Sequence, residues 1–475
     1  MSSKTGTLMV FALLAGSACA KKEAAPTPAP ATTAATKEAT PAPAPPAPAA
    51  EPELRHGIAW FENQPEAALA DARAKKRPIL VDLWAPWCHT CLSMQSYILT
   101  DEKLPGAKDQ FTFLAIDTEK AENAKFLETV PVEVWPTFYV LDPDGPTIRG
   151  RWLGSGSPQQ FSQFLADGKR AMDMAHTGDL PPGDPLVMLL AGDALAAQKK
   201  FTEAAAKYGE ALAGAPKDWA RRPDALVARA SALLKAKDAG GCADLAIASM
   251  DQTGNAVSAA DFAYYGVACA DELPKEDARK QKAYTIAEKR LAALCLEDGA
   301  ALTPDDRADA CANLREAREA LGSKDGAKKA AEKQLAVLEA GSQGTPDDVA
   351  LTYDWNRADT LYYLGRGDEA LGLVIDREKA LPDSYLPPHY QARLYQKMQK
   401  WDLGLAAMDR ALAKAYGPRK VGMMGLKADL LVGAGKKDEA KKVVEEQLAA
   451  YKALPEGQKQ PAREEATAKR LAEWK

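Results

Sequence analysis

Short apolar runs and amphipathic segments alternate along the chain from about residue 60 to about residue 170. The run ILVDLWA at 79–85 is almost continuously apolar, as a buried central strand should be. The predicted helices cover 65–78, 88–99 and 157–171, and the predicted strands cover 79–85, 111–117, 137–145 and 147–154. This alternation of strands and helices predicts an α/β domain, to which we assign residues 56–172.

From residue 184 to the end, apolar positions keep a helical spacing, and Ala, Leu, Lys and Glu dominate the composition. Several segments place small residues at matching offsets and resemble the tetratricopeptide repeat (TPR). They cover 192–216, 358–382, 392–416 and 428–451, whereas 225–340 is helical but less regular. Each such repeat is a helix pair that buries its apolar face against its neighbours. We therefore predict a multidomain chain in which an all-α, TPR-like helical solenoid over 184–475 follows the α/β domain.

The N-terminus has the layout of a secretory signal peptide over residues 1–20. Lys4 precedes a short apolar stretch, and the small-residue sequence GSACA follows it. We consider Cys19 as a lipidated residue, with ordinary cleavage after Ala20 as the alternative. Residues 21–55 are almost all Ala, Pro and Thr with a few charges, and we predict a disordered linker there. These features place the mature protein in the bacterial cell envelope, either free in the periplasm or anchored to a membrane by lipid.

The charge pattern narrows the classes of partner. The net charge is −5, and acidic and basic residues are interspersed along the chain. A nucleic-acid-binding protein would instead gather its Lys and Arg residues on one face. We therefore expect no nucleic acid, and we expect membrane contact only through a lipid on Cys19.

Cys88 and Cys91 form a Cys-His-Thr-Cys sequence directly after the first predicted strand. Three kinds of chemistry use such a pair: a metal site, a structural bridge or a redox pair. A structural zinc normally needs four ligands, and the chain has no second Cys-x-x-Cys sequence. A bridge that closes so short a loop removes little chain entropy. At a helix N-terminus, free N–H groups and the helix dipole stabilise a thiolate, which is the nucleophile of disulfide exchange. We therefore predict a redox pair, with Cys88 exposed and Cys91 buried, and we expect neither a metal nor a cofactor.

Three stretches in the expected order resemble the thioredoxin superfamily. ILVDLWAPWCHTC resembles the active-site stretch, VWPTFYVLDPDG the cis-proline strand, and GRWLGSGSPQQFSQFL the closing strand and helix. The similarity is greatest to the periplasmic thioredoxin domain of transmembrane disulfide reductases. The resemblance implies a central mixed sheet flanked by helices.

The resemblance also implies roles for four residues. Cys88 attacks the substrate disulfide, and Cys91 resolves the mixed disulfide. Asp82 corresponds to a buried acid that assists deprotonation of the second cysteine; a structural carboxylate is the alternative. Pro136 corresponds to the cis-proline whose neighbouring backbone holds the substrate strand, although the residue type alone favours a trans bond.

The substrate groove is expected to be bordered by Trp87, Trp135 and Thr137.

Two positions depart from the family pattern. Phe113 stands where the family often has a lysine paired with the buried acid, so a proton relay through that acid is less certain. Trp135 is larger than the usual residue before the cis-proline and would either narrow the groove or pack beneath it.

His89 and Thr90, between the two cysteines, are expected to tune the redox potential. A protonated imidazole beside Cys88 stabilises its thiolate, which makes the disulfide a better oxidant. An exposed histidine without an electrostatic role is the alternative. Because the surrounding sequence resembles reductases, the direction of electron flow stays open.

Four more cysteines lie in the less regular helical part. In an oxidising compartment they would form structural disulfides, and the pairs adjacent in sequence suit neighbouring antiparallel helices best. Free, buried cysteines are the alternative. The two expected pairs are Cys242 with Cys269 and Cys295 with Cys311.

The function predicted from these features is that of an envelope thiol–disulfide oxidoreductase that reduces or exchanges disulfides of secreted proteins. Its partners would be protein thiols and disulfides, an envelope electron donor or acceptor, and a protein or peptide recruited by the repeats. The alternative is a binding or assembly lipoprotein in which the thioredoxin-like domain only helps to hold clients.

Overall fold

The computed structural model describes residues 51–145, 147–178, 181 and 183–474. These residues belong to one unit. The predicted signal peptide, Cys19 and most of the predicted linker lie outside the described residues.

A six-stranded mixed sheet forms the centre of the first domain, in the order β1-β2-β4-β3-β5-β6. The central strand β3 pairs with β4 in parallel and with β5 antiparallel. The strands are β1 (Glu53–Arg55), β2 (Ile58–Glu62), β3 (Ile79–Trp84), β4 (Thr112–Asp117), β5 (Thr137–Leu141) and β6 (Ile148–Leu153). The four predicted strands are present, whereas the β1–β2 hairpin was not predicted. Because the sheet begins at Glu53, the predicted end of the linker at residue 55 is wrong.

Helices flank this sheet, and each face of the sheet carries an apolar cluster. One cluster includes Trp60, Phe113, Phe138 and Phe161, and the other includes Val81 and Tyr139, among further residues. The helices are α1 (Pro65–Lys75), α2 (His89–Tyr97), α3 (Ala107–Gln110), α4 (Ala124–Leu127) and α5 (Pro158–Thr177). The first five residues of β3 are buried between these clusters, and Trp84, where the strand leads toward α2, is half-buried.

Helices make up the rest of the described chain. They are α6 (Pro185–Ala197), α7 (Phe201–Gly214), α8 (Arg222–Lys235), α9 (Ala239–Ser249), α10 (Val257–Glu272), α11 (Ala278–Leu296), α12 (Pro304–Ala320), α13 (Lys324–Ser342), α14 (Asp347–Tyr363), α15 (Gly367–Ala380), α16 (Leu386–Lys397), α17 (Trp401–Lys414), α18 (Gly417–Gly433), α19 (Lys437–Ala453) and α20 (Pro461–Ala472), with a short 3-10 turn η3 (Glu456–Gln458). Small residues allow close helix packing: a Cβ atom built on Gly192 would lie 2.5 Å from the ring of Tyr208. We call α6–α20 the helical region.

Two disulfides join neighbouring helices of the helical region. Cys242 on α9 is bonded to Cys269 on α10, with a Cα–Cα distance of 5.9 Å. Cys295 on α11 is bonded to Cys311 on α12, with a Cα–Cα distance of 4.9 Å. These are the two pairings expected from the sequence, and they lie in its least regular part.

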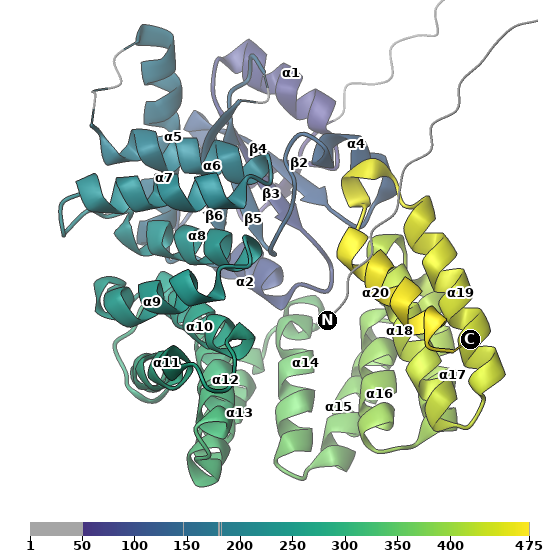
Figure 1. The fold of residues 1–475 in the computed structure, drawn as a ribbon. Coiled ribbons are helices and arrows are strands. Elements are labelled where there is room, and N and C mark those ends of the chain that lie inside the picture. The colour runs from purple at the N-terminus through teal and green to yellow at the C-terminus, as the bar shows by residue number, and fades with distance from the viewer. Residues whose placement is uncertain (1–50, 146, 179–180, 182, 475) are drawn as a thin grey trace, which may run out of the picture. The chain divides into compact units, whose positions relative to one another are not determined.

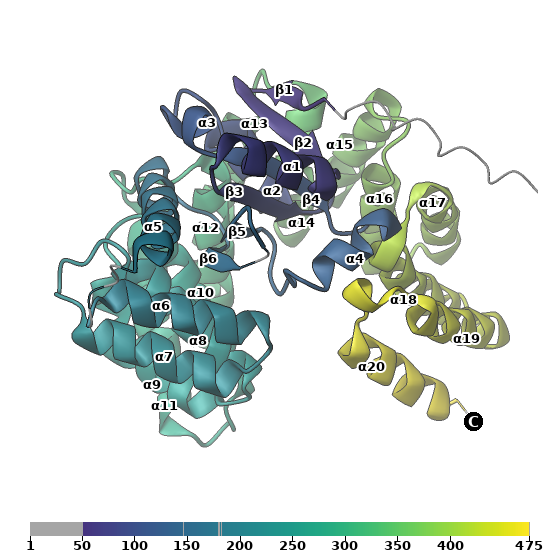
Figure 2. The same ribbon diagram turned by 90° about the horizontal axis from the view of Figure 1, so that it is seen from above.

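The thioredoxin-like domain lies between two arms of the helical region (Figure 1, Figure 2). Strand β6 packs against α6 and α8. Helix α2 packs against α12 and α14, and α4 packs against η3. Much of the inner side of the helical region therefore contacts the chain's own sheet domain.

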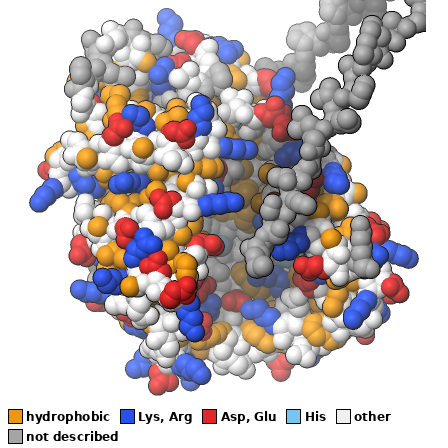
Figure 3. Space-filling model, viewed as in Figure 1, with side chains coloured by type: hydrophobic (Ala, Val, Ile, Leu, Met, Phe, Trp, Pro, Cys, Tyr) orange, Lys and Arg blue, Asp and Glu red, His pale blue; other side chains and the backbone are white. Residues whose placement is uncertain are grey.

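On the face of the molecule shown in Figure 3, acidic and basic side chains are interspersed with apolar and neutral ones. Among the described residues, none of the helices combines the length and hydropathy needed to cross a bilayer.

A buried polar network fixes β6 to the helical region. Arg151 on β6 forms an ion pair with Glu133 at 2.8 Å, and its backbone N–H donates to Asp193 Oδ2 at 3.1 Å. The Tyr208 hydroxyl donates to the other oxygen of Asp193 at 2.9 Å. Burial raises the pKa of Asp193 to about 7, although Arg151 and Arg221 oppose the shift. We call this group of residues the β6 anchor.

Tyr208→Phe tests the β6 anchor. The substitution removes the hydroxyl and leaves one oxygen of the buried Asp193 carboxylate without its donor. We expect the free energy of unfolding to fall by about 1–3 kcal/mol, measured by urea denaturation. The matched change Tyr362→Phe removes an exposed hydrogen bond to the Lys397 carbonyl and should change stability by less than about 0.5 kcal/mol. Equal losses in the two variants would contradict the assigned importance of the anchor.

Candidate active site

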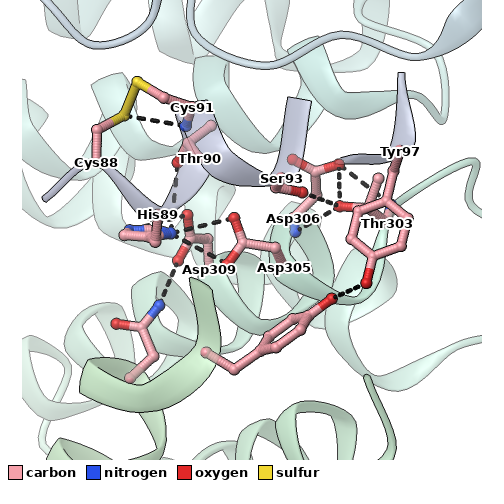
Figure 4. Close-up of polar contacts among 12 residues, drawn as sticks. Cys88, His89, Thr90, Cys91, Ser93, Tyr97, Thr303, Asp305, Asp306 and Asp309 are labelled. Atoms are coloured by element: carbon pink, nitrogen blue, oxygen red, sulfur yellow. Dashed lines mark hydrogen bonds and ion pairs between the residues drawn. A yellow bond between two sulfur atoms is a disulfide. The ribbon is translucent and has the colours of Figure 1, made fainter. Parts of the chain in front are cut away.

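The two cysteines of the Cys-His-Thr-Cys sequence lie at the start of α2, where β3 ends (Figure 4). They form a disulfide with a Cα–Cα distance of 5.2 Å. Cys88 is the N-cap residue of α2, and the backbone N–H of Cys91 donates to Cys88 Sγ at 3.0 Å. In the reduced state the same N–H group would stabilise a Cys88 thiolate. The location at a helix N-terminus is as the sequence predicted.

The burial of Cys88 differs from the prediction. Its side chain was expected to be exposed, but Cys88 is only 4% exposed and Cys91 is 1% exposed. The two cysteines pack in a small apolar cluster with Trp84, Trp87 and Trp135. The physical reason is that three large aromatic side chains of the sheet domain itself pack around the pair, one of them, Trp135, from a distant part of the sequence.

Asp82 lies on β3, with 1% of its surface exposed. Gln95 Nε2, on α2, donates to Asp82 Oδ2 at 3.0 Å, while Asp82 Oδ1 is buried with no hydrogen-bond partner among the described residues. Burial raises the pKa of Asp82 to about 7, and the hydrogen bond from Gln95 opposes that shift. At neutral pH this carboxyl can therefore both hold and release a proton.

Gln95 was not singled out in the sequence. It lies four residues after Cys91 on α2, so helical spacing places both on the face that meets β3. Phe113 stands where the family often has a lysine, and its ring packs against that of Trp60 with 5.0 Å between the ring centres. The amide of Gln95 is thus the polar partner of the buried acid.

The Trp135–Pro136 peptide bond is cis, as the family resemblance implied. The ring of Trp135 contacts that of Trp87 at 4.9 Å, and its Nε1 donates to Thr118 Oγ1 at 2.9 Å. Thr137 does not border a groove: it is fully buried, and its hydroxyl donates to the Val134 carbonyl at 2.7 Å. Its side chain instead fixes the turn that holds Pro136.

His89 forms an ion pair with acidic residues of α12 (Figure 4). Its Nδ1 lies 3.1 Å from both carboxylate oxygens of Asp305, and its Nε2 lies 3.9 Å from Asp309 Oδ2. Burial opposes the charged imidazole, but the carboxylates of Asp309 and Asp305 outweigh it and raise the pKa of His89 to about 10. Thr90 Oγ1 lies 3.5 Å from His89 Nδ1. The histidine is therefore held as an imidazolium at neutral pH.

Ligand atoms of the same three side chains, His89, Asp305 and Asp309, lie within 4.8 Å of one another, which also fits the spacing of metal ligands. A metal ion would bind the neutral imidazole, so it would have to displace the proton that the two carboxylates stabilise.

A second set of contacts involves Trp87, the residue before Cys88. Trp87 Nε1 donates to Glu119 Oε1 at 2.8 Å, and the backbone N–H of Arg419 donates to the other oxygen of Glu119. The guanidinium of Arg419 lies 4.8 Å from the centre of the Trp87 ring. Nearby, Tyr416 donates to Asp117 at 2.6 Å. Arg419 on α18 thus contacts Trp87, the residue before Cys88, while Tyr416 binds the end of β4.

A cavity of about 380 Å³ opens beside the Cys-His-Thr-Cys loop. His89, Thr90 and Trp135 line it from the sheet domain, while Asp261 on α10 and Asp309 on α12 line it from the helical region. Both parts of the chain therefore shape the space next to the disulfide.

Residues 65–169 match a family described as a thioredoxin-like domain. Curated relatives named "Thiol:disulfide interchange protein DsbD" match between 20% and 24% of the chain. The relative from Yersinia enterocolitica is 29% identical over 119 residues, which cover 24% of this chain and 21% of that protein. The relative from Pseudoalteromonas atlantica is 31% identical over 109 residues, covering 22% and 18%.

The chain thus contains a thioredoxin-like domain, and it spans about a fifth of the length of the curated relatives it matches. Together with the Cys88–Cys91 disulfide, this likeness supports thiol–disulfide oxidoreductase activity. A solved structure of a monomeric IFIT1 mutant with Gppp-AAAA covers 61% of this chain and 66% of that chain, at 13% identity. Its TM-score of 0.33 is too low to indicate a shared fold.

Asp82→Asn tests the raised pKa of the buried acid. Folded Asp82 keeps its proton up to about pH 7, whereas the unfolded chain releases it near the ordinary aspartate pKa of 3.8, so this group makes folding less favourable as pH rises between those values. The difference in free energy of unfolding, Asp82→Asn minus the unsubstituted protein, should therefore increase from pH 4 to pH 8, by up to about 4 kcal/mol. Urea denaturation at the two pH values measures the gain.

The control for this prediction is Asp109→Asn, which changes an exposed acid of the same domain. Its effect on stability should be the same at both pH values. A pH-independent effect of Asp82→Asn would show that the buried carboxyl is ionised throughout this range and would contradict the assignment.

Proposed function

We propose that this protein is a cell-envelope thiol–disulfide oxidoreductase that reduces or exchanges disulfides of secreted proteins through Cys88 and Cys91. The observation that carries the proposal is the disulfide at the N-terminus of α2, where the Cys91 N–H caps Cys88 Sγ. The cis peptide bond before Pro136 and the buried Asp82 complete the arrangement.

The reduced protein would act in two exchange steps. The Cys88 thiolate attacks one sulfur of a substrate disulfide, and the substrate S–S bond breaks, so that one substrate thiolate leaves and takes up a proton. Cys91 then loses its proton and attacks Cys88 Sγ, which breaks the mixed disulfide and releases the second substrate thiol. Two electrons pass to the substrate, and the oxidised pair forms.

Asp82 has the chemistry to assist the second step. A carboxyl with a pKa of about 7 can accept a proton from Cys91 at neutral pH through a direct contact or a water molecule. Gln95 holds one of its oxygens and leaves the other free. We assign Gln95 as a positioning residue for this acid.

Different observations support the two directions of electron flow, reduction and oxidation of the substrate. The likeness to the disulfide interchange proteins favours a reductant, whereas an imidazolium at His89 stabilises a Cys88 thiolate and favours an oxidant. The reduction potential of the pair, measured against glutathione, decides between them. A value near about −270 mV indicates a reductant, and one near about −120 mV indicates an oxidant.

The compartment and the role of the repeats are also part of the proposal. The predicted signal peptide, with or without a lipid on Cys19, and the likeness to DsbD proteins support an envelope location. In this proposal the TPR-like helices recruit a protein partner through surfaces that the sheet domain leaves open.

One observation favours a second candidate function. A cysteine that is 4% exposed is poorly placed to attack another protein. This burial favours a binding or assembly lipoprotein in which the thioredoxin-like domain helps to hold clients. The activity of the cysteine pair separates the two candidates.

Cys88→Ser and Cys91→Ser test the enzymatic proposal. Cys88→Ser should lower insulin reduction to the uncatalysed rate, because it removes the attacking sulfur. Cys91→Ser should still attack but should accumulate a mixed disulfide, because the resolving sulfur is missing. Turbidity of released insulin B chain measures the first effect, and intact mass measures the second.

The matched control replaces Cys242 and Cys269 by serine together, which removes a disulfide from the helical region and leaves the proposed site intact. Turnover per folded molecule should be retained in this control. Unchanged turnover in Cys88→Ser would reject the oxidoreductase and leave the binding protein.

A further inference from the structure

The Cys88–Cys91 disulfide is buried although the proposed chemistry needs contact with a second disulfide. Exchange requires the attacking thiolate and the two sulfurs of the target to align. With only 4% of Cys88 exposed, a disulfide within another protein reaches it only when the surrounding residues move, so insulin reduction by the unsubstituted protein reports how often they do. Either a small molecule is the substrate or part of the chain moves aside.

The first side of the disulfide is held by α12 and α14. Besides the ion pair of His89 with Asp305 and Asp309, two hydrogen bonds tie α2 to these helices. Ser93 Oγ lies 3.3 Å from Thr303 Oγ1, and the Tyr353 hydroxyl lies 2.8 Å from that of Tyr97 (Figure 4). Asp305 is fully buried, so its charge depends on His89 for compensation.

The second side is held by α18. Arg419 bonds to Glu119 through its backbone and lies over the Trp87 ring with its guanidinium. Trp87 in turn is part of the cluster that surrounds both cysteines. Residues directly next to Cys88 in sequence, Trp87 and His89, are therefore each bound by a different part of the helical region.

We propose that the helical region is an autoinhibitory cover over the Cys88–Cys91 disulfide, held shut by the contacts of His89 with Asp305 and Asp309 and of Trp87 with Arg419. The inference rests on the proposed oxidoreductase function and adds its regulation. The β6 anchor keeps α6 and α8 attached to the sheet domain, so the cover opens at α12 and α18 while the other end stays in place. Release exposes Cys88 to protein disulfides.

The burial of Cys88 sets the expected selectivity of the closed form, because a small disulfide needs less room beside the sulfur than a loop of a folded protein does. The cavity of about 380 Å³ beside the loop is lined by His89 and Thr90 and by neither cysteine. The closed protein should therefore discriminate against protein disulfides more strongly than against small ones. Opening the cover removes this difference.

The experiment compares two substrates of the reduced, full chain: insulin and the small, uncharged 2-hydroxyethyl disulfide. Both react with the same Cys88 thiolate, so the ratio of their rate constants cancels any change in the intrinsic reactivity of that sulfur. Asp305→Asn combined with Asp309→Asn releases the first side of the cover, and Arg419→Ala releases the second. Each change should raise the ratio of the insulin rate to the small-disulfide rate by at least about tenfold, because a buried ion pair or cation–π contact is lost.

The two releasing changes have opposite effects on charge, which separates opening from electrostatics. The aspartate changes remove negative charge, and the arginine change removes positive charge. A purely electrostatic effect on insulin would move the ratio in opposite directions, whereas opening moves it in the same direction. The matched control Glu288→Gln breaks an ion pair with Arg318 inside the helical region, at 2.8 Å, and should leave the ratio unchanged.

The outcomes are distinct. The cover is supported if the ratio of the insulin rate to the small-disulfide rate rises in both releasing variants and does not change in the control. A flat ratio in both, movement in opposite directions, or an equal rise in the control overturns it. A rise in Arg419→Ala alone overturns the role assigned to His89. If the reduced wild type reacts with neither substrate faster than free cysteine does, the proposed function itself fails. If the aspartate variant does not fold, Arg419→Ala alone decides: a flat ratio overturns the cover, and a rise with a flat control supports it.

Discussion

The arrangement of the whole protein depends on one constraint, the burial of the Cys88–Cys91 disulfide at the start of α2. The sheet places Cys88 and Cys91 at the end of β3, and the helix N-terminus favours a thiolate there. In the oxidised form the pair packs among three tryptophans of the sheet domain. Trp87 and Trp135 donate to Glu119 and Thr118, and these two residues in turn accept hydrogen bonds from Arg419 and Gln458 of the helical region. The chemistry of the pair and the packing of more than half the chain are therefore physically connected at this point.

Much of the thioredoxin-like domain could be predicted because its signals are local. A continuous apolar run gave β3, and the spacing of the cysteines after it placed α2 and its N-cap. The β1–β2 hairpin was missed because strands of three and five residues give too little periodicity. The cis bond before Pro136 followed only from the family resemblance, since proline alone favours trans.

The contacts between the two parts of the chain could not be predicted, because they join residues far apart in sequence. His89 and Asp305 are separated by 216 residues. In the sequence, Asp305 and Asp306 fit the acidic first turn of a helix, where the helix dipole favours negative charge. That local explanation is sufficient, so nothing points to a second role. The omission of Glu119 and Arg419, which are bonded across 300 residues, has the same origin. Gln95, in contrast, lies only 13 residues from its partner Asp82, and helical spacing from Cys91 could have placed it beside that acid.

The β6 anchor joins the two predicted domains, 56–172 and 184–475, so the boundary between them divides the sequence but does not separate two independently stable parts. A fragment that ended after α5 would lose Asp193 and Tyr208 and would leave the Arg151–Glu133 pair without its neighbours. The surface of β6 that α6 and α8 cover would then face water. Such an excised fragment would be less stable than the same residues within the full chain, and it would also present an uncovered disulfide. The reactivity of its cysteines would therefore not represent that of the intact protein, in which the disulfide is buried.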